Sequence, residues 1–190
     1  MLDLFLEQDT ALFLLLNGLH HQYLDVLMVY ISSTTLWIPL YVALLYGLYK
    51  QLNNFKHWAI ISLLIILSVL VADQITSSLM KPYFKRLRPS HTTSLESKIH
   101  LVNQYKGGKY GFASSHAANS FAIATFLYLL MGSRIGFGLF IWAFLVSYSR
   151  IYLGVHYPLD ILFGSLVGIF SATLLFRFVP NKFLKKPQSL

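Results

Sequence analysis

A series of apolar blocks separated by short polar segments is the main pattern of this chain. Five of the blocks are close to the ~20 residues that a helix needs to cross the core of a bilayer. They cover residues 24–49, 58–80, 115–131, 135–153 and 159–179. The first block has a soft interior at residues 32–35 and at Pro39, where we expect a kink. The pattern predicts an all-α fold, a polytopic bundle of transmembrane helices.

A shorter apolar stretch at residues 10–19 precedes these blocks. Because it is short for a span, we expect residues 1–23 to form an interfacial N-terminal segment, with a sixth span as the alternative. The acidic residues Glu7 and Asp9 stand where a cleaved signal peptide would carry basic residues, so none is expected. The polar connection at residues 89–113 is predicted to lie over one end of the bundle. The chain, residues 1–190, should therefore form one membrane-embedded domain with five or six spans.

Composition supports the membrane interpretation. Only 12% of the residues are charged and 56% are hydrophobic, whereas a soluble domain has about 25% charged residues. The net charge of +8 does not indicate nucleic-acid binding, because the basic residues flank the apolar blocks as they do beside membrane helices. The chain has no cysteine, which excludes disulfides, thiolate metal sites and a cysteine nucleophile.

Because successive spans alternate in direction, three polar segments far apart in the sequence are expected at one membrane face. If the second block ends at this face, the third begins there, the fourth returns to it and the fifth starts from it. The polar segments are residues 81–89, 114–116 and 149–160. They carry the fixed cations Lys81, Arg88 and Arg150 and the helix-start donors Ser114 and Ser115. Cations that converge with N–H groups at a helix start form an anion site, and phosphate is the natural ligand.

Two histidines and one carboxylate supply candidate chemistry at this face. His156 and Asp160 are four residues apart at the entry to a helix, so the carboxylate can bond one ring nitrogen and leave the other free to attack phosphorus. His116, on a different helix, can protonate the departing oxygen as a general acid. Two other interpretations remain open from the residues alone. The histidines and Asp160 can be metal ligands of a metal-dependent hydrolase, or the cationic pocket can hold an anion without turnover.

Three motifs resemble the signature of the type 2 phosphatidic acid phosphatase family, written KxxxxxxRP, PSGH and SRxxxxxHxxxD. Residues 81–89 match the first motif and residues 149–160 match the third at every specified position. The second motif departs, since Ala113 and Ser115 stand where the family has proline and glycine. The resemblance covers about residues 58–178 and implies a membrane lipid phosphatase that uses a histidine nucleophile and no metal or other cofactor.

The resemblance also implies how the phosphate would be held. Lys81, Arg88 and Arg150 would bind its oxygens and stabilise charge in the transition state. Ser114 and the backbone N–H groups at the start of the helix would complete the cradle. The role of Ser115 is less determined, because glycine lets the backbone approach the phosphate closely and serine adds a hydroxyl that can join the donors or change the loop.

For the chemical steps, the resemblance implies that His156 becomes a phosphohistidine while Asp160 orients and activates it. His116 would protonate the leaving group, and water would then release phosphate. Transfer of the phosphoryl group to a lipid or sugar acceptor is an alternative use of the same site, because an alcohol competes with water at the phosphohistidine.

Two charged residues outside the motifs have candidate roles. Asp73 lies two turns below Lys81 with Ser77 between them, and a carboxylate inside a span is a functional candidate by default. We expect Asp73 to orient that face of the helix instead of touching the substrate. Arg86 can either contact phosphate or face lipid headgroups. The remaining histidines are expected in interfacial or loop positions; they are His20, His21, His57, His91 and His100.

The distribution of lysine and arginine gives the expected orientation. Eight of these residues fall on the predicted catalytic side and seven on the other, and setting aside the three that bind phosphate leaves five against seven. The positive-inside rule then places the C-terminus in the cytoplasm and the site on the periplasmic or outer face of the inner membrane. The expected substrate is a membrane lipid phosphate. The candidates are undecaprenyl diphosphate, phosphatidylglycerophosphate or phosphatidate, and a phosphate of lipid A.

Overall fold

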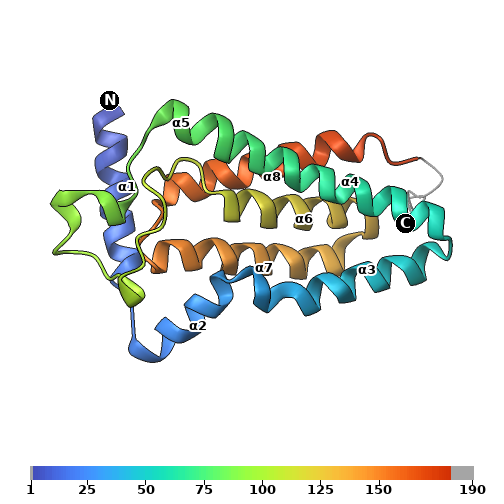
Figure 1. The fold of residues 1–190 in the computed structure, drawn as a ribbon, viewed down its shortest axis with the longest axis horizontal. Coiled ribbons are helices and arrows are strands. Elements are labelled where there is room, and N and C mark those ends of the chain that lie inside the picture. The colour runs from blue at the N-terminus through green and yellow to red at the C-terminus, as the bar shows by residue number, and fades with distance from the viewer. Residues whose placement is uncertain (1, 181–190) are drawn as a thin grey trace.

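The computed structural model describes residues 2–180, and the long elements in this range are helices (Figure 1). They are α1 (Leu2–Asn17), α2 (Gln22–Ser32), α3 (Ile38–Leu52), α4 (Phe55–Gln74), α5 (Lys81–Phe84), α6 (Ser115–Met131), α7 (Ser133–Tyr152) and α8 (Pro158–Phe176). A π-helical turn, Ile75–Met80, joins α4 to α5. Short 3₁₀ turns cover Thr34–Trp37, Pro89–His91, Thr93–Leu95 and Val102–Gln104. The all-α prediction is confirmed.

Several helices are long and apolar enough to cross a bilayer. By length and composition these are Phe55–Phe84, Ile135–Tyr152 and Pro158–Phe176. The helices α2 and α3 meet this test together as one broken span, with a bend of 67° between them. Large apolar side chains on these helices stay exposed, such as Phe144 and Phe170, as expected of surfaces that face lipid. The chain is therefore a multi-pass membrane protein.

The bend in the first predicted span lies at the polar residues and not at the proline. Helix α2 ends at Ser32, Ser33 is extended, and the chain resumes as a 3₁₀ turn from Thr34. Pro39 falls within the first turn of α3, where a proline costs no hydrogen bond. The soft interior predicted from the sequence is thus the position of the break, and Ser32, the last residue of α2, is buried there.

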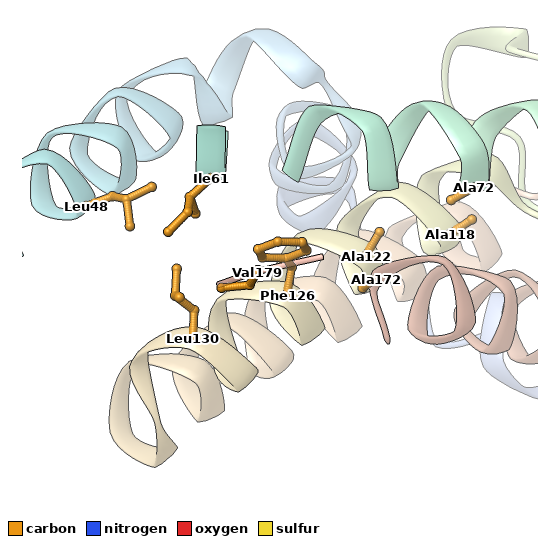
Figure 2. Packing of buried hydrophobic residues seen from close by; sticks show 9 residues of the cluster. All are labelled: Leu48, Ile61, Ala72, Ala118, Ala122, Phe126, Leu130, Ala172 and Val179. Carbon is orange, nitrogen blue, oxygen red and sulfur yellow. The ribbon is translucent and has the colours of Figure 1, made fainter. Parts of the chain in front are cut away.

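Helix α6 lies at the centre of the bundle, between α4, α7 and α8 (Figure 1). Its faces are covered by small residues on the neighbouring helices, and the buried cluster in Figure 2 joins α3, α4, α6 and α8 around Phe126. A Cβ at Gly164 or Gly168 of α8 would collide with backbone carbonyl oxygens of α6. The two glycines therefore form a close-packing pair, and the pair brings the N-terminal ends of α6 and α8 together.

At one end of the bundle, α1 lies across the helix ends beside the connection between α5 and α6 (Figure 1). The buried Asn17 fastens this end. Its amide donates to the carbonyl oxygens of Tyr152 at 2.8 Å and Ile151 at 3.2 Å, and its Oδ1 accepts from the His100 N–H at 2.8 Å. One side chain therefore ties α1, α7 and the connection together around the end of the bundle where the predicted polar segments meet.

Candidate active site

His156 and Asp160 are in contact, as their spacing predicts. Asp160 lies in the first turn of α8, and its Oδ2 is 3.2 Å from Nδ1 of His156. The same oxygen accepts from the Tyr157 N–H at 3.0 Å, which fixes the carboxylate against the start of the helix. Both side chains are buried, with 1% and 0% of their surface exposed. Because Nδ1 faces the carboxylate, Nε2 is the ring nitrogen left for attack on a substrate.

The connection before α6 closes over this pair at a glycine. A Cβ added at Gly111 would lie 2.8 Å from Oδ2 of Asp160 and 3.6 Å from Nδ1 of His156. The backbone is held there by two bonds, from the Gly111 N–H to the Arg86 oxygen at 2.9 Å and from the Arg88 N–H to the Lys109 oxygen at 3.1 Å. The close approach of backbone to the carboxylate therefore requires glycine at this position.

Two buried guanidinium groups lie beside the histidine. Arg88 is 8% exposed and donates from Nε to the Tyr110 oxygen at 3.2 Å, while Arg150 is 3% exposed and donates to Oγ of Ser32. Within residues 2–180, Nη1 of Arg88 and Nε of Arg150 are buried and have no hydrogen-bond partner. Burying unpaired donors on a cation is costly. The two groups are therefore suited to an anion with several acceptor oxygens.

Lys81 is held by the serine that replaces the family's glycine. Its Nζ donates to Oγ of Ser115 at 2.6 Å. The Ser115 hydroxyl also bonds to Ser77 at 2.8 Å and to Thr76 at 3.0 Å, both in the π-helical turn of the neighbouring helix. The Ser115 hydroxyl thus positions the lysine, a contact that a glycine could not make.

Asp73 joins this network through Ser77. Its Oδ1 accepts from Oγ of Ser77 at 3.5 Å and from Nδ2 of Asn119 at 3.3 Å. The carboxylate thus connects to Lys81 only through serine hydroxyls. That Asp73 orients the helix face that carries the lysine stays a prediction.

Ser114 is fully buried at the N-cap of α6. Its Oγ accepts from the Ala117 N–H at 3.5 Å, and its own N–H donates to the Asp160 carbonyl oxygen at 2.9 Å. The hydroxyl caps the helix, and the backbone ties the start of α6 to the start of α8. The first turn of α6 carries His116, which lines two cavities of about 310 and 400 Å³.

Electrostatic coupling shows that the cations and His156 share one site. Burial lowers the pKa of His156 well below its ordinary value, and the charges of Arg88, Arg150 and Lys81 lower it further. Burial and the charge of Arg150 also lower the pKa of Arg88. The His156 imidazole is therefore neutral at neutral pH, the form that a nucleophile requires.

Asp9 and Arg86 lie beside the pair of His156 and Asp160, and sequence reasoning did not place Asp9 there. Arg86 bridges two carboxylates, with Nη2 2.6 Å from Oδ2 of Asp9 and Nη1 3.1 Å from Oδ1 of Asp160. Oδ1 of Asp9 accepts from the Leu159 N–H at 2.8 Å. Arg86 also lies 4.0 Å from the ring centre of Tyr157. These contacts with two carboxylates and a tyrosine were not among the roles expected of Arg86, and contact with phosphate stays a prediction. The sequence could not indicate this pairing, because Asp9 lies in α1 and is distant from the motifs.

The other histidines lie outside this cluster. His20 stacks on His100 with ring centres 3.9 Å apart, and Nε2 of His100 lies 2.9 Å from the Asp25 carboxylate. Nε2 of His91 lies 3.3 Å from the Gly107 oxygen in the loop. In the part of the chain that the structure describes, no three histidine, aspartate or glutamate side chains gather as metal ligands do.

Comparison with known proteins gives a consistent set of matches. The model of the PAP2 superfamily matches residues 62–184. A lipid A 4'-phosphatase from Bacteroides thetaiotaomicron is 37% identical over 100% of this chain and 84% of its own length. The undecaprenyl-diphosphatase BcrC from Bacillus subtilis is 28% identical over 90% of this chain and 83% of its own length. The crystal structure of Aquifex aeolicus LpxE superposes with a TM-score of 0.70 at 29% identity, covering 89% of this chain and 94% of that chain.

Proposed function

This chain belongs to the PAP2 superfamily and is a membrane lipid phosphatase, and from that premise we propose that it removes the 4'-phosphate of lipid A. The observation that carries the choice of substrate is the 37% identity to a lipid A 4'-phosphatase over 100% of the chain. The relative that acts on undecaprenyl diphosphate is less similar, at 28%. That lipid is the alternative substrate.

The contacts of His156 support its role as nucleophile. Asp160 holds Nδ1, and the neutral Nε2 attacks phosphorus, so that an N–P bond forms while the P–O bond to the lipid breaks. Lys81, Arg88 and Arg150 neutralise the charge on the phosphoryl oxygens, and the buried donors of both arginines support this role. Removing one such donor typically lowers the rate by ~10²–10³.

His116 serves as the general acid of the first step and the general base of the second. Its position at the start of α6, in the cavities beside Arg150, supports protonation of the departing lipid oxygen. Neutral His116 would then take a proton from water, which attacks the phosphohistidine and releases inorganic phosphate. In this mechanism the fixed cations carry out the charge stabilisation that a metal supplies in other phosphatases, so no metal is required.

The proposed topology has five spans. The bent pair α2 and α3 forms the first, residues 55–84 the second, and α6, α7 and α8 the others. Helix α6 has 17 residues, at the lower limit for a span, and is covered on its sides by the other helices. Helix α1 lies at the interface on the catalytic side. The excess of lysine and arginine on the other side favours the cytoplasm there and the periplasm for the site; Lys182, Lys185 and Lys186 in that count lie outside the described residues.

A substrate panel with purified protein tests the proposal. Lipid A carrying only a 4'-phosphate, undecaprenyl diphosphate and phosphatidylglycerophosphate are compared by initial rates of phosphate release in detergent. We expect the highest kcat/KM for lipid A, with activity that survives EDTA and is blocked by vanadate. In His156→Gln, kcat/KM should fall at least ~10³-fold. In His21→Ser, a change at an exposed helix cap, kcat/KM should stay unchanged. Preference for undecaprenyl diphosphate would refute the substrate, and inactivation by EDTA would refute the metal-free mechanism.

A further inference from the structure

A polar cavity extends from His116 into the membrane-embedded part of the bundle. Its volume is about 310 Å³, within the ~300–1,000 Å³ range of small-molecule pockets. Its polar lining comes from Ser32, Thr34, Asp73, Ser115, Asn119 and Ser120. Ser32 and Ser115 bond to Arg150 and Lys81, and Asp73 bonds to Ser77 beside the lysine. The mechanism gives no task to Thr34, Asn119 and Ser120, yet polar groups at this depth are costly unless they serve a function.

Two buried atoms in the cavity wall have no partner among the described residues. Nε1 of Trp142 is an unpaired donor and Oδ1 of Asn119 is an unpaired acceptor. The side chain of Trp142 lines the cavity, and the residue is only 7% exposed. Its ring is held by edge contacts with Trp37 and Tyr41, at 5.7 and 6.1 Å between ring centres. An unpaired donor and an unpaired acceptor need partners of the kinds that the hydroxyl and amide groups of a ligand can supply.

The cavity also has a negative charge and an apolar end. The carboxylate of Asp73 lies on its wall. At the other end, Tyr41, Val69 and Ile123 are shared with an apolar cavity of about 270 Å³ between α3 and α4. An occupant that fits both cavities has hydroxyl or amino groups near His116 and hydrocarbon chains beyond them.

On the basis of the proposed function, we infer that this cavity binds the sugar of the leaving group, and that Asp73, Asn119 and Trp142 select an acylated hexosamine. In the proposed mechanism the lipid oxygen that departs from phosphorus lies beside His116, so the group attached to it enters one of the two cavities that His116 lines. Of these two, the cavity of about 310 Å³ adjoins the apolar cavity that acyl chains require. A hexosamine offers hydroxyl and amide groups to these residues, and its acyl chains continue into the apolar cavity. The leaving group of undecaprenyl diphosphate is itself a phosphate, which the carboxylate of Asp73 repels.

A comparison of three substrates distinguishes binding of the sugar from indirect support of the phosphate-binding residues. The substrates are lipid A with a single 4'-phosphate, undecaprenyl diphosphate, and p-nitrophenyl phosphate, which has neither a sugar nor a second phosphate. Asp73→Asn removes the charge and keeps the shape, and Trp142→Phe removes the N–H and keeps an aromatic ring. Thr125→Val is the matched control, because Thr125 is buried on α6 with an unpaired hydroxyl but does not line the cavity.

We expect both variants to lower kcat/KM for lipid A by roughly tenfold or more, the usual effect of losing a buried hydrogen bond to a substrate. In Trp142→Phe, activity on p-nitrophenyl phosphate should stay within about twofold of wild type, and Asp73→Asn should lose less activity on undecaprenyl diphosphate and p-nitrophenyl phosphate than on lipid A. The control should leave all three rates unchanged.

Equal losses on all three substrates would overturn the inference and make Asp73 a support for Lys81. An unchanged rate on lipid A in both variants would also overturn it. If the wild-type protein hydrolyses undecaprenyl diphosphate but not lipid A, the proposed substrate itself is refuted. The rates of the wild-type protein on the three substrates thus test the proposed function. The ratios of variant to wild-type rates test the role of the cavity.

Discussion

At the scale of single residues, the proposed reaction depends on a neutral imidazole among fixed cations. Burial and the charges of Arg88, Arg150 and Lys81 lower the pKa of His156. Protonated His156 cannot attack phosphorus, so activity is lost as the pH falls through this pKa. Because the pKa is lowered, the loss from this group should occur well below the ordinary imidazole value of about 6.5.

Arg88→Gln should move the acid limb of the pH–activity profile, where His156 becomes protonated, to higher pH. Removing the charge takes away one of the causes that lower the pKa of His156, so the inactive imidazolium forms at a higher pH than in the wild type. The level of kcat/KM should also fall, by ~10²–10³, because a phosphate ligand is lost. The measurement is kcat/KM for p-nitrophenyl phosphate as a function of pH. Lys109→Gln, which removes an exposed cation from the same loop, should leave the limb in place. A limb at the same pH in Arg88→Gln would contradict the electrostatic argument.

The sequence predicted the contact between His156 and Asp160, because four-residue spacing at a helix start brings these side chains together. The location of the three cations at one membrane face was predicted from hydropathy, because alternating spans return the segments that carry them to the same side. The contacts of Ser115 were not predictable. Its hydroxyl bonds to Ser77 and Thr76 in a π-helical turn, and the residue types in that turn do not predict a π-helix. Residue patterns show which groups gather, but the partner of a particular hydroxyl depends on local backbone geometry.

At the scale of elements, α1 contributes to the site from outside the family motifs. Asp9 contacts both Arg86 and the backbone of α8, and Arg86 holds the free oxygen of the carboxylate that positions the nucleophile. Burial raises the pKa of Asp9, and the bonds from Arg86 and Leu159 oppose this. Together these contacts keep an ionised arginine between two carboxylates at the buried start of α8.

We therefore predict that Arg86→Met lowers kcat by ~10–10² and leaves KM nearly unchanged, since small displacements of a catalytic group are costly and the guanidinium of Arg86 is held by Asp9 and Asp160. Arg86→Lys should restore part of the activity, and Asp9→Asn should have a smaller effect in the same direction. The measurement is a comparison of kcat and KM on lipid A. Lys85→Asn, which removes the exposed neighbouring cation and tolerates its left-handed backbone, is the control. A rise in KM alone would instead assign Arg86 to substrate binding.

Close packing of α6 against α8 places Ser114 beside Asp160, and a substitution at Gly164 tests this packing. A Cβ there would collide with the Ser114 carbonyl oxygen, next to the bond between the Ser114 N–H and the Asp160 oxygen. Gly164→Ala should destabilise the fold by ~1–3 kcal/mol and lower activity. Thermal unfolding in detergent measures the first effect. In Gly138→Ala the new methyl group meets no atom within 4 Å, so stability should be unchanged or higher. Equal unfolding temperatures for both variants would contradict the packing argument.

At the scale of the whole molecule, the apolar blocks were sufficient to predict a helical membrane bundle with a polar site at one end. The block at residues 115–131 coincides with α6, because Ser114 caps its start and Gly132 ends it with a positive φ. The second block was predicted too short at both ends, since residues 55–84 continue through the π-helical turn and past Pro82. The position of α1 was not predictable, because its placement depends on Asn17 and Asp9 bonding to distant segments.

The proposed topology predicts which loops are reachable from the periplasm, and the chain is well suited to the test because it has no native cysteine. Ser97→Cys lies in the exposed loop on the catalytic side, and Gln51→Cys lies in the exposed turn at the other end of the bundle. With five spans and the site outward, a membrane-impermeant maleimide should label residue 97 in cells whose outer membrane alone is permeabilised. Residue 51 should be labelled only after the inner membrane is opened. Labelling of both residues before that step would refute the span count, because residues 51 and 97 are joined by a single span. The reverse pattern would keep the bundle and invert its orientation, placing phosphate release in the cytoplasm.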